Sequence, residues 1–214
     1  MTTEGSRPDA DRARPGDITQ EATETQVQTV ATRLFSELGY DAVSNQMIAD
    51  AVGADLALVT ERYGGKGALY TRVFADVSQR WRDRVQAAGG EITPDADGLL
   101  RLINLYVDHC LEHPEMARLW IHRWMSDASD IVGLEEQTSA LNMRQALEVI
   151  RPAVRPDVDA EAALWTLVWT INGYLQSGFL DTSGRATAPG ASDTLSRFRR
   201  HLDQLIRLMT TTAP

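Results

Sequence analysis

Several residue types and patterns are scarce in this chain of 214 residues, and their scarcity excludes whole classes of protein. Cys110 is the single cysteine, so no framework of internal disulfides can form. No run of about 18 apolar residues occurs, which excludes a transmembrane helix by the usual length criterion. The N-terminal segment also has no hydrophobic stretch of the kind that signal peptides carry. We therefore expect a cytoplasmic protein without a membrane-spanning part.

Basic residues are in the minority as well. The formal net charge is −9 and the pI about 4.9, which opposes indiscriminate binding to nucleic acid because such binding needs a broad basic field. Lys66, the only lysine, lies in a stretch of the opposite sign, since residues 62–84 hold six basic and two acidic residues, a local net charge of +4. A small basic face is therefore compatible with the acidic chain.

The apolar residues recur every three or four positions, which is the spacing of amphipathic helices. No alternating strand pattern and no internal repeat occurs. Residues 1–17 are polar and aperiodic, which indicates a disordered arm, and residues 181–191 have the composition of a loop. The pattern predicts an all-α fold of about nine helices. The predicted helices cover about residues 25–38, 44–52, 55–63, 67–88, 99–113, 114–124, 134–150, 160–180 and 195–209.

The segment Tyr40–Tyr70 has the rhythm of a helix-turn-helix. Ser44 can cap a short helix, Gly53 can supply a turn, and Asp55 can cap the next helix. Lys66 follows between two glycines at the start of another helix, where a cation can meet a phosphate without carrying sequence information. The segment therefore predicts contact with DNA.

Residues from about 27 to 70 resemble the DNA-binding domain of the TetR family of bacterial repressors. The likeness rests on Ala31, Leu34-Phe35, Gly39-Tyr40, Ser44, Ile48-Ala49, Gly53, Tyr63, Lys66 and Leu69-Tyr70. The resemblance implies three N-terminal DNA-binding helices within residues 18–66 and a connecting helix over residues 67–90. It also implies a helical core for ligand binding and dimerisation over residues 91–214.

The resemblance further implies which residues meet operator DNA. These are Ser44, Asn45, Gln46, Asp55, Leu56, Ala57, Thr60, Arg62, Tyr63 and Lys66. The chain departs from the family pattern in this stretch: the family usually has glycine where Ala57 stands and an aromatic residue where Thr60 stands. Arg62 replaces a usual His or Tyr and can take over a phosphate contact. Since Asp55 and Glu61 also belong to the predicted recognition helix, we expect a base readout with few arginine–guanine contacts.

Residues 160–180 are apolar nearly all round, and such a helix has to be buried on every side. A single subunit of this size can cover only one face of it. The resemblance implies that this helix and the last one, at about residues 158–180 and 192–210, form a four-helix interface between two identical subunits. The two recognition helices of such a dimer meet successive major grooves roughly 34–36 Å apart.

Aromatic and methionine side chains gather in the second half of the chain. Trp120 and Trp124, like Trp165 and Trp169, are spaced four residues apart, so each pair lies on one helix face. Ordinary packing explains any one of them, whereas the set predicts an aromatic-lined pocket for a flat, apolar or cationic ligand. The predicted ligand-binding residues are Tyr106, His109, Met116, Trp120, Trp124, Met143, Trp165, Trp169 and Asn172.

The run His109-Cys110-Leu111-Glu112-His113 matches the H-x-x-E-H motif of one class of zinc peptidases. Pro114 ends the helix directly after it, and no third ligand is evident nearby. We therefore interpret these residues as interhelical polar contacts. A zinc hydrolase using His109, Glu112 and His113 is a remote alternative, and a metal-sensing site that includes Cys110 is another. No P-loop, dinucleotide fingerprint or nucleophile elbow occurs, so neither an enzyme nor a cofactor is predicted.

Taken together, the resemblance implies a dimeric, DNA-binding transcriptional regulator. It would be a repressor that a small apolar or aromatic molecule releases from its operator. The alternative is a small-molecule or metal sensor on the same fold, with weak or lost DNA binding. Two predicted DNA contacts have a second interpretation, because Ser44 fits a helix cap and Tyr63 fits the core.

Overall fold

The structure, a computed structural model, describes residues 15–210 of the chain and the side chains of residues 24–210. The described part is almost wholly helical, as the sequence predicts, and none of its helices is long and apolar enough to cross a membrane. The elements are α1 (Pro15–Leu38), α2 (Asn45–Val52), the π-helical turn η1 (Leu58–Arg62), α3 (Gly65–Ala88), the 3₁₀ turn η2 (Gly89–Glu91), α4 (Ala96–Glu112), α5 (Pro114–Trp124), α6 (Leu134–Thr138), α7 (Ala140–Ala153), α8 (Ala160–Ser177), β1 (Phe179–Leu180), β2 (Ala186–Thr187) and α9 (Ser192–Met209).

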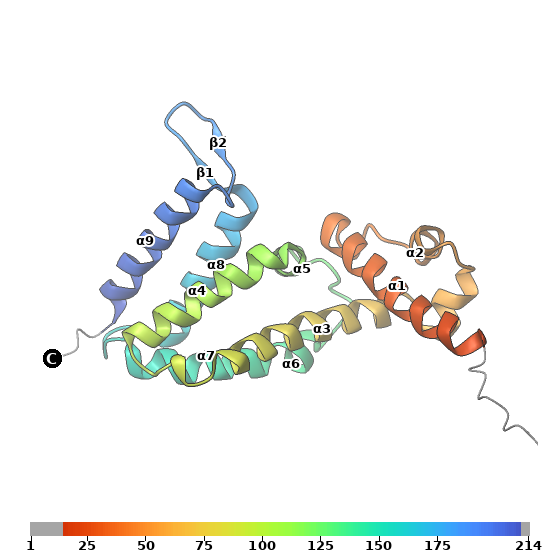
Figure 1. Cartoon of the computed structure of the whole chain (residues 1–214), viewed down its shortest axis with the longest axis horizontal. Coiled ribbons are helices and arrows are strands. Elements are labelled where there is room, and N and C mark those ends of the chain that lie inside the picture. Colours follow the sequence, from red (N-terminus) through yellow and green to blue (C-terminus); the bar gives the residue numbers. More distant parts are fainter. Residues whose placement is uncertain (1–14, 211–214) are drawn as a thin grey trace, which may run out of the picture.

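The elements form two packed groups that share one helix (Figure 1). The N-terminal helices α1 and α2 and the turn η1 pack around the first half of α3. Helices α4 to α9 form the second group, in which α4 packs on α5, α7 and α9, and α8 packs on α5 and α7. Helix α3 runs from the first group into the second, so the two are joined by continuous helix rather than by a loop.

The start of the chain differs from the expectation in detail. Helix α1 begins at Pro15, a residue type that suits the first helical turn, so its first residues belong to the predicted arm. The rest of that arm, residues 1–14, lies outside the described residues. In α2 the buried residues are Ile48 and Ala49, and Ala51 is exposed.

The predicted recognition helix is also different. Ser44 caps α2 as predicted, with its Oγ accepting from the backbone N–H of Met47 at 3.1 Å. An Asp55-capped α-helix is predicted next, and the chain is helical over residues 56–62; residues 58–62, however, form a π-helical turn, and Ala57 before it makes no side-chain cap. In this segment Val59 is fully buried, whereas Leu56, a predicted DNA contact, is 41% exposed.

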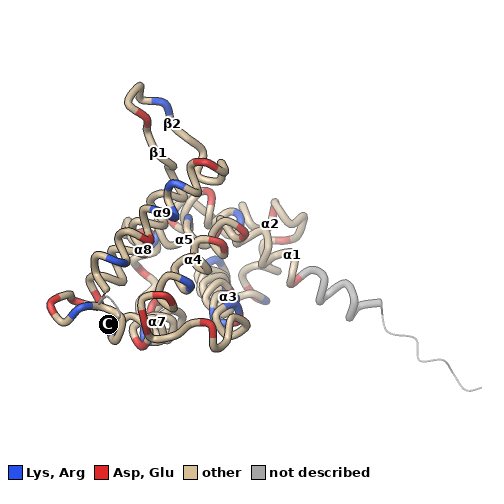
Figure 2. Tube along the Cα trace, turned by 60° about the vertical axis from the view of Figure 1, so that its left-hand side comes forward, with Lys and Arg blue, Asp and Glu red and all other residues tan. Residues whose placement is uncertain are grey.

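A small hairpin replaces the end of the predicted helix at residues 160–180 and part of the predicted loop. Gly178, at φ +63°, ends α8, and an alanine Cβ there would collide with the carbonyl oxygen of Thr187. Strand β1 then pairs antiparallel with β2, with Phe179 opposite Thr187. The hairpin extends beyond the ends of α8 and α9 (Figure 1). Figure 2 shows acidic and basic residues interspersed along the trace, including this hairpin.

The N-terminal group packs on the core through α1 and α5, and one carboxylate adds hydrogen bonds to this contact. The two oxygens of Asp127, in the loop after α5, accept from the backbone N–H groups of Tyr40 and Asp41, at 2.6 and 2.9 Å. The tyrosine hydroxyl adds a longer contact of 3.4 Å to Asp130. Gly39 has a positive φ, and a Cβ on it would lie 3.2 Å from Nδ1 of His122 and 3.4 Å from the Asp127 carboxylate. A glycine at this position therefore lets the loop approach closely.

The loop that carries Asp127 is shaped by Arg123 at the end of α5. Its guanidinium donates to the backbone carbonyls of Asp127, Ala128 and Ile131 and pairs with both carboxylate oxygens of Glu135, at 2.6 and 3.1 Å. A planar guanidinium with five N–H donors can form this many hydrogen bonds at once. It holds Ala128 in a left-handed conformation, at φ +56°, that residues with a Cβ rarely adopt.

Removing the Asp127 carboxylate should loosen this junction. We expect Asp127→Ala to lower the free energy of unfolding by about 2 kcal/mol, because two backbone donors lose a charged acceptor. In native-state hydrogen exchange, the amides of Tyr40 and Asp41 should exchange faster. Asp41→Ala is a matched control, since it removes the same charge nearby from a side chain with no described hydrogen bond. Unchanged exchange in Asp127→Ala would contradict this role.

A histidine is buried where α3 and α4 meet. The His109 ring is 2% exposed and packs against the rings of Trp81 and His113, with centroids 5.4 and 4.9 Å away. Burial, followed by the charges of His113, Arg84 and Arg80, lowers the pKa of His109 to about 4. The imidazole is therefore neutral at physiological pH.

This burial makes stability depend on pH. Between pH 6.5 and 4 the unfolded chain binds a proton at His109 that the folded chain does not, so stability is present above pH 6.5 and is lost as the pH falls. We expect the free energy of unfolding to fall by about 2 kcal/mol between pH 7 and pH 5 from this residue alone. Urea unfolding at both pH values measures the change. His109→Gln should reduce it, whereas the exposed control His201→Gln should not.

Candidate DNA-contact face and core cavity

The ten predicted DNA contacts lie on the first turn of α2, on η1 and the residues before it, and at the start of α3. Seven of them are exposed, namely Ser44, Gln46, Asp55, Leu56, Ala57, Thr60 and Arg62. The Thr60 hydroxyl donates to the carbonyl of Leu56 at 3.0 Å, which leaves its oxygen as an acceptor. The Gln46 amide donates to Asp50 at 2.7 Å.

Lys66 and Asn45 are half-buried and hold this face together. The Asn45 side-chain oxygen accepts from the backbone N–H of Lys66 at 2.6 Å, so it joins α2 to the start of α3. The Lys66 ammonium donates to the carbonyl of Tyr40 at 3.0 Å and lies 4.1 Å from the centre of its ring. Because an ammonium has three donors, two are left for a phosphate.

Tyr63 belongs to the core of the N-terminal group. It is 2% exposed, and its buried hydroxyl has no partner among the described residues. Of the two interpretations that the sequence left open, the structure favours the core position, because a phosphate cannot reach this hydroxyl without a rearrangement. Arg62 lies over its ring, 5.8 Å from the centroid, and remains exposed.

Only part of the basic stretch at residues 62–84 belongs to the predicted DNA face; the rest attaches α3 to the core. Arg80 pairs with Asp76 and Glu115, and Arg84 pairs with Glu112. Arg82 donates to the carbonyl of Thr138 and to Asn142. These three arginines attach α3 to the core, so the local charge of +4 overstates the basic character of the predicted DNA face.

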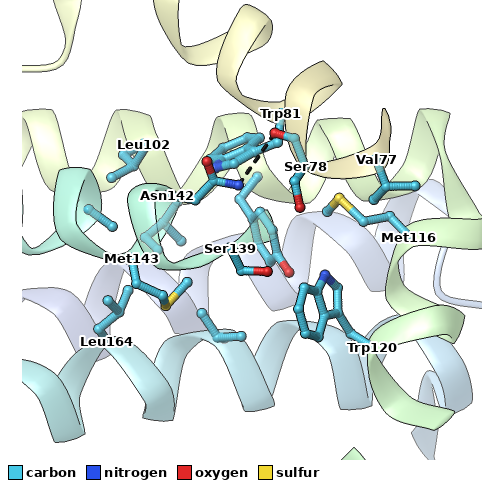
Figure 3. A pocket seen from close by; sticks show the side chains of 14 residues that line it. Val77, Ser78, Trp81, Leu102, Met116, Trp120, Ser139, Asn142, Met143 and Leu164 are labelled. Atoms are coloured by element: carbon cyan, nitrogen blue, oxygen red, sulfur yellow. Dashed lines mark hydrogen bonds between the residues drawn. The ribbon is translucent and has the colours of Figure 1, made fainter. Parts of the chain in front are cut away.

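The core holds an apolar cavity of about 80 Å³ between α3, α4, α5, α7 and α8 (Figure 3). Four predicted ligand residues line it: Tyr106, Met116, Trp120 and Met143. The other lining residues are Val77, Ser78, Trp81, Leu102, Ile103, Ser139, Asn142, Ala146, Leu164 and Val168.

The remaining predicted ligand residues do not line the cavity. Trp124 and Trp165 pack edge to face, with centroids 6.0 Å apart. Trp169 is 58% exposed on α8, and His109 contacts Trp81 from outside the cavity wall. Asn172 supports a lining residue instead: its amide donates to the hydroxyl of Tyr106 at 2.9 Å. Four-residue spacing placed each tryptophan pair on one face, but it could not say which face meets a cavity.

Ser78 and Asn142 are the lining residues whose sequence context carried a usable signal. Each is polar at a position that the helical pattern assigns to the interior, and each is at most 8% exposed. The Asn142 amide donates to the Ser78 carbonyl at 3.4 Å and accepts from Arg82. Trp81 carried no comparable signal, because it continues the apolar stripe of α3 like any core residue.

The H-x-x-E-H residues do not gather around a common point. Glu112 is held by Arg84 through two hydrogen bonds of 2.6 and 3.0 Å, and Cys110 is buried near Tyr106. Burial raises the pKa of the Cys110 thiol to about 12, which disfavours the thiolate that binds metals. No group of three His, Cys, Asp or Glu residues suited to a metal occurs in the described part of the chain. The geometry therefore does not support a metal-sensing or zinc-hydrolase site.

A continuous series of aromatic ring contacts runs from the predicted DNA face past the cavity to α8. Neighbouring centroids in the series are between 4.8 and 6.1 Å apart. Lys66 lies over the first ring, and Trp120 contributes to the cavity wall. The rings in order are Tyr40, Tyr70, Phe74, Trp120, Trp124, Trp165 and Trp169.

Similarity to other proteins is found at the level of structure, since no family model and no curated protein matches the sequence. A bacterial regulatory protein of the TetR family from Rhodococcus RHA1 aligns over 89% of this chain and 98% of its own, with 18% identity and a TM-score of 0.63. The fatty acid degradation regulator FadR from Bacillus halodurans aligns over 92% and 96%, with 14% identity and a TM-score of 0.63. The ketosteroid transcriptional regulator KstR2 of Mycobacterium tuberculosis aligns over 88% and 95%, with 18% identity and a TM-score of 0.58.

These alignments span both helical groups and nearly the full length of the compared chains. At such identities the likeness concerns the fold, and it agrees with the arrangement that the residues at 27–70 led us to expect. The chain has the fold of the TetR family of transcriptional regulators.

Proposed function

We propose that the chain is a dimeric transcriptional regulator of the TetR type, which binds operator DNA and is released from it by a small apolar or aromatic molecule. The fold likeness supports a regulator, and the exposed residues of α2 and η1 offer a surface for the major groove. Two compared proteins are named for fatty acid degradation and ketosteroids, which agrees with an apolar ligand.

The shared helix α3 is the observation that carries this proposal. Its first turn supplies Lys66 to the predicted DNA face, and its fourth and fifth turns supply Val77, Ser78 and Trp81 to the cavity wall. A ligand that displaces Trp81 therefore pushes on the same helix that positions Lys66. If such a ligand favours one spacing of the two recognition elements, it shifts the population toward that spacing and changes DNA affinity.

The exposed face of α8 supports the dimer. Trp169 is 58% exposed on a helix whose other face is fully buried, and Ala162 and Gly173 lie on the exposed side as small residues. Leu208 of α9 is 69% exposed. Large apolar side chains exposed on neighbouring helices favour a protein partner, and a second copy of the chain presents the same surface.

A loss of the lysine charge should weaken binding to every DNA sequence alike. We expect Lys66→Ala to reduce affinity for operator and scrambled duplexes by similar factors, and to lower the salt slope by about 1, because a phosphate contact is lost. Fluorescence anisotropy at two salt concentrations measures both effects. The exposed Arg144, on α7, provides the control Arg144→Ala. A change in base preference would contradict the phosphate role.

A charge on the exposed face of α8 should separate the subunits. We expect Trp169→Arg to give a folded monomer, because the side chain is exposed in one subunit and would be an unpaired buried charge in the dimer. Sedimentation and circular dichroism distinguish this outcome from unfolding. Val132→Arg, at an 86% exposed position in the loop before α6, should leave the dimer intact. A dimeric Trp169→Arg protein would contradict the proposed interface.

The geometry of the recognition turn favours a second candidate, a sensor with weak or lost DNA binding. The recognition element is helical over residues 56–62, but its residues 58–62 form a π-helical turn, and acidic Asp55 and Glu61 are exposed in this segment. Acidic side chains repel phosphates, so sequence-specific contacts would have to compensate. Binding that shows no preference for any duplex, together with ligand binding in the core, would favour the sensor.

A further inference from the structure

Among the residues that the structure describes, the cavity wall contains no ionisable side chain apart from that of Tyr106. None of its lining residues is Asp, Glu, Lys, Arg or His. The charged group that reaches the wall is Arg82, which does not line the cavity. Its guanidinium is engaged by the carbonyl of Thr138, by Asn142 and by Gln79. The cavity therefore offers a ligand no free counter-charge.

This absence restricts the charge of the ligand. Moving an ion from water into an apolar cavity costs several kcal/mol unless a partner of opposite charge compensates. Tyr106 does not compensate an ammonium, because burial raises the pKa of its hydroxyl and keeps it neutral. Of the ligands that the aromatic residues led us to expect, a cationic one is therefore disfavoured, and an anion is disfavoured for the same reason.

One side of the cavity offers a hydrogen-bond acceptor. The Thr138 hydroxyl donates to the carbonyl of Leu134 at 2.7 Å, so its proton is used. The hydroxyls of Thr138 and Ser139 are 3.1 Å apart, and Ser139 must be the donor in that contact. A hydroxyl has one proton and two acceptor positions, so the Ser139 oxygen is left to accept.

Donors face the same space. The indole N–H of Trp120 and the hydroxyl of Ser78 have no hydrogen-bond partner among the described residues, although Ser78 is only 3% exposed. Neither the Trp120 indole nitrogen nor the Ser78 hydroxyl oxygen is fully enclosed by protein. Figure 3 shows the side chains of Ser78, Ser139 and Trp120 around the same space. The polar part of the cavity therefore combines a free acceptor with free donors.

We propose that the ligand of this cavity is an uncharged apolar molecule that carries a hydroxyl group. A hydroxyl can donate to Ser139 and accept from Trp120 or Ser78, whereas a ketone or ether can only accept. The rest of the molecule lies against Trp81, Met116 and other apolar side chains of the wall. This inference rests on the proposed ligand-binding role of the core, and it holds whether or not the N-terminal group binds DNA.

Four probes with the same ring system test the proposal: 2-naphthol, naphthalene, 2-naphthoate and 2-naphthylmethylammonium. Isothermal titration calorimetry of the full chain at pH 7.5 gives the affinity of each. We expect 2-naphthol to bind one molecule per chain, about tenfold more tightly than naphthalene because of its added hydrogen bonds. Both ions should bind at least tenfold more weakly than 2-naphthol. An ion that binds as tightly as 2-naphthol overturns the uncharged ligand, and equal binding of naphthalene overturns the hydroxyl.

A variant locates the hydroxyl. Ser139→Ala should lower the affinity for 2-naphthol several-fold and leave that for naphthalene unchanged, because naphthalene makes no hydrogen bond to the Ser139 hydroxyl. Ser129→Ala, exposed in the loop after α5, is the matched control and should bind like the original chain. Circular dichroism establishes that both variants fold. Unchanged 2-naphthol binding by Ser139→Ala would overturn the assigned partner.

Separate DNA titrations distinguish this inference from the proposed function. Binding of 2-naphthol by a chain that does not bind any duplex would contradict the regulator and support the ligand class. Specific DNA binding by a chain that binds none of the four probes would support the regulator and overturn the ligand class for this cavity.

Discussion

The shared use of helix α3 is the constraint on which the rest of the structure depends. Its N-terminal half completes the buried cluster of α1 and α2 through Leu69, Tyr70 and Phe74. Its C-terminal half is tied to the core by arginines and lines the cavity. Since an α-helix is stiff along its axis, neither half can move without the other. Movement in the core therefore has a direct mechanical route to the predicted DNA face.

Two other contacts limit how that movement can occur. Asp127 fixes the backbone at Tyr40 and Asp41 to the loop after α5, and the carbonyl and ring of Tyr40 hold the Lys66 ammonium. The predicted phosphate contact is thus attached both to α3 and, through Tyr40, to the loop after α5. Trp120 also belongs to α5 and lines the cavity, so the same two helices frame both sites.

Charge is used differently in the two helical groups. In the core, Arg80, Arg84 and Arg123 pair with carboxylates, and the described residues that line the cavity carry no charge. On the predicted DNA face, basic residues are few and acidic ones are close by. This contrast explains how an acidic chain can carry a DNA-binding fold: affinity for phosphates would depend on a few placed donors rather than on a general basic field.

The sequence by itself determined the helical fold, because helical spacing and end signals are local. The cap at Ser44, the turn at Gly53 and the stop at Gly89 all stand as predicted. The resemblance at residues 27–70 led to the correct fold, and the all-apolar helix at residues 160–180 was correctly placed except for its last three residues. Those residues turn away because a glycine with positive φ at 178 starts a hairpin that no strand pattern announced.

Only the tertiary structure decided which side chains surround the cavity and which arginines are free. Tyr106, Met116, Trp120 and Met143 line the cavity, but Trp124 and Trp165 do not, although all belong to the same predicted aromatic set. Helical spacing gives the face of a helix and not its neighbour, so it cannot tell a cavity wall from packed core. Likewise Arg80 and Arg84 belong to the basic stretch of the sequence, but in the structure they form ion pairs with Glu115 of α5 and Glu112 of α4. These partners are about 30 residues away in sequence, so the sequence does not indicate the pairing.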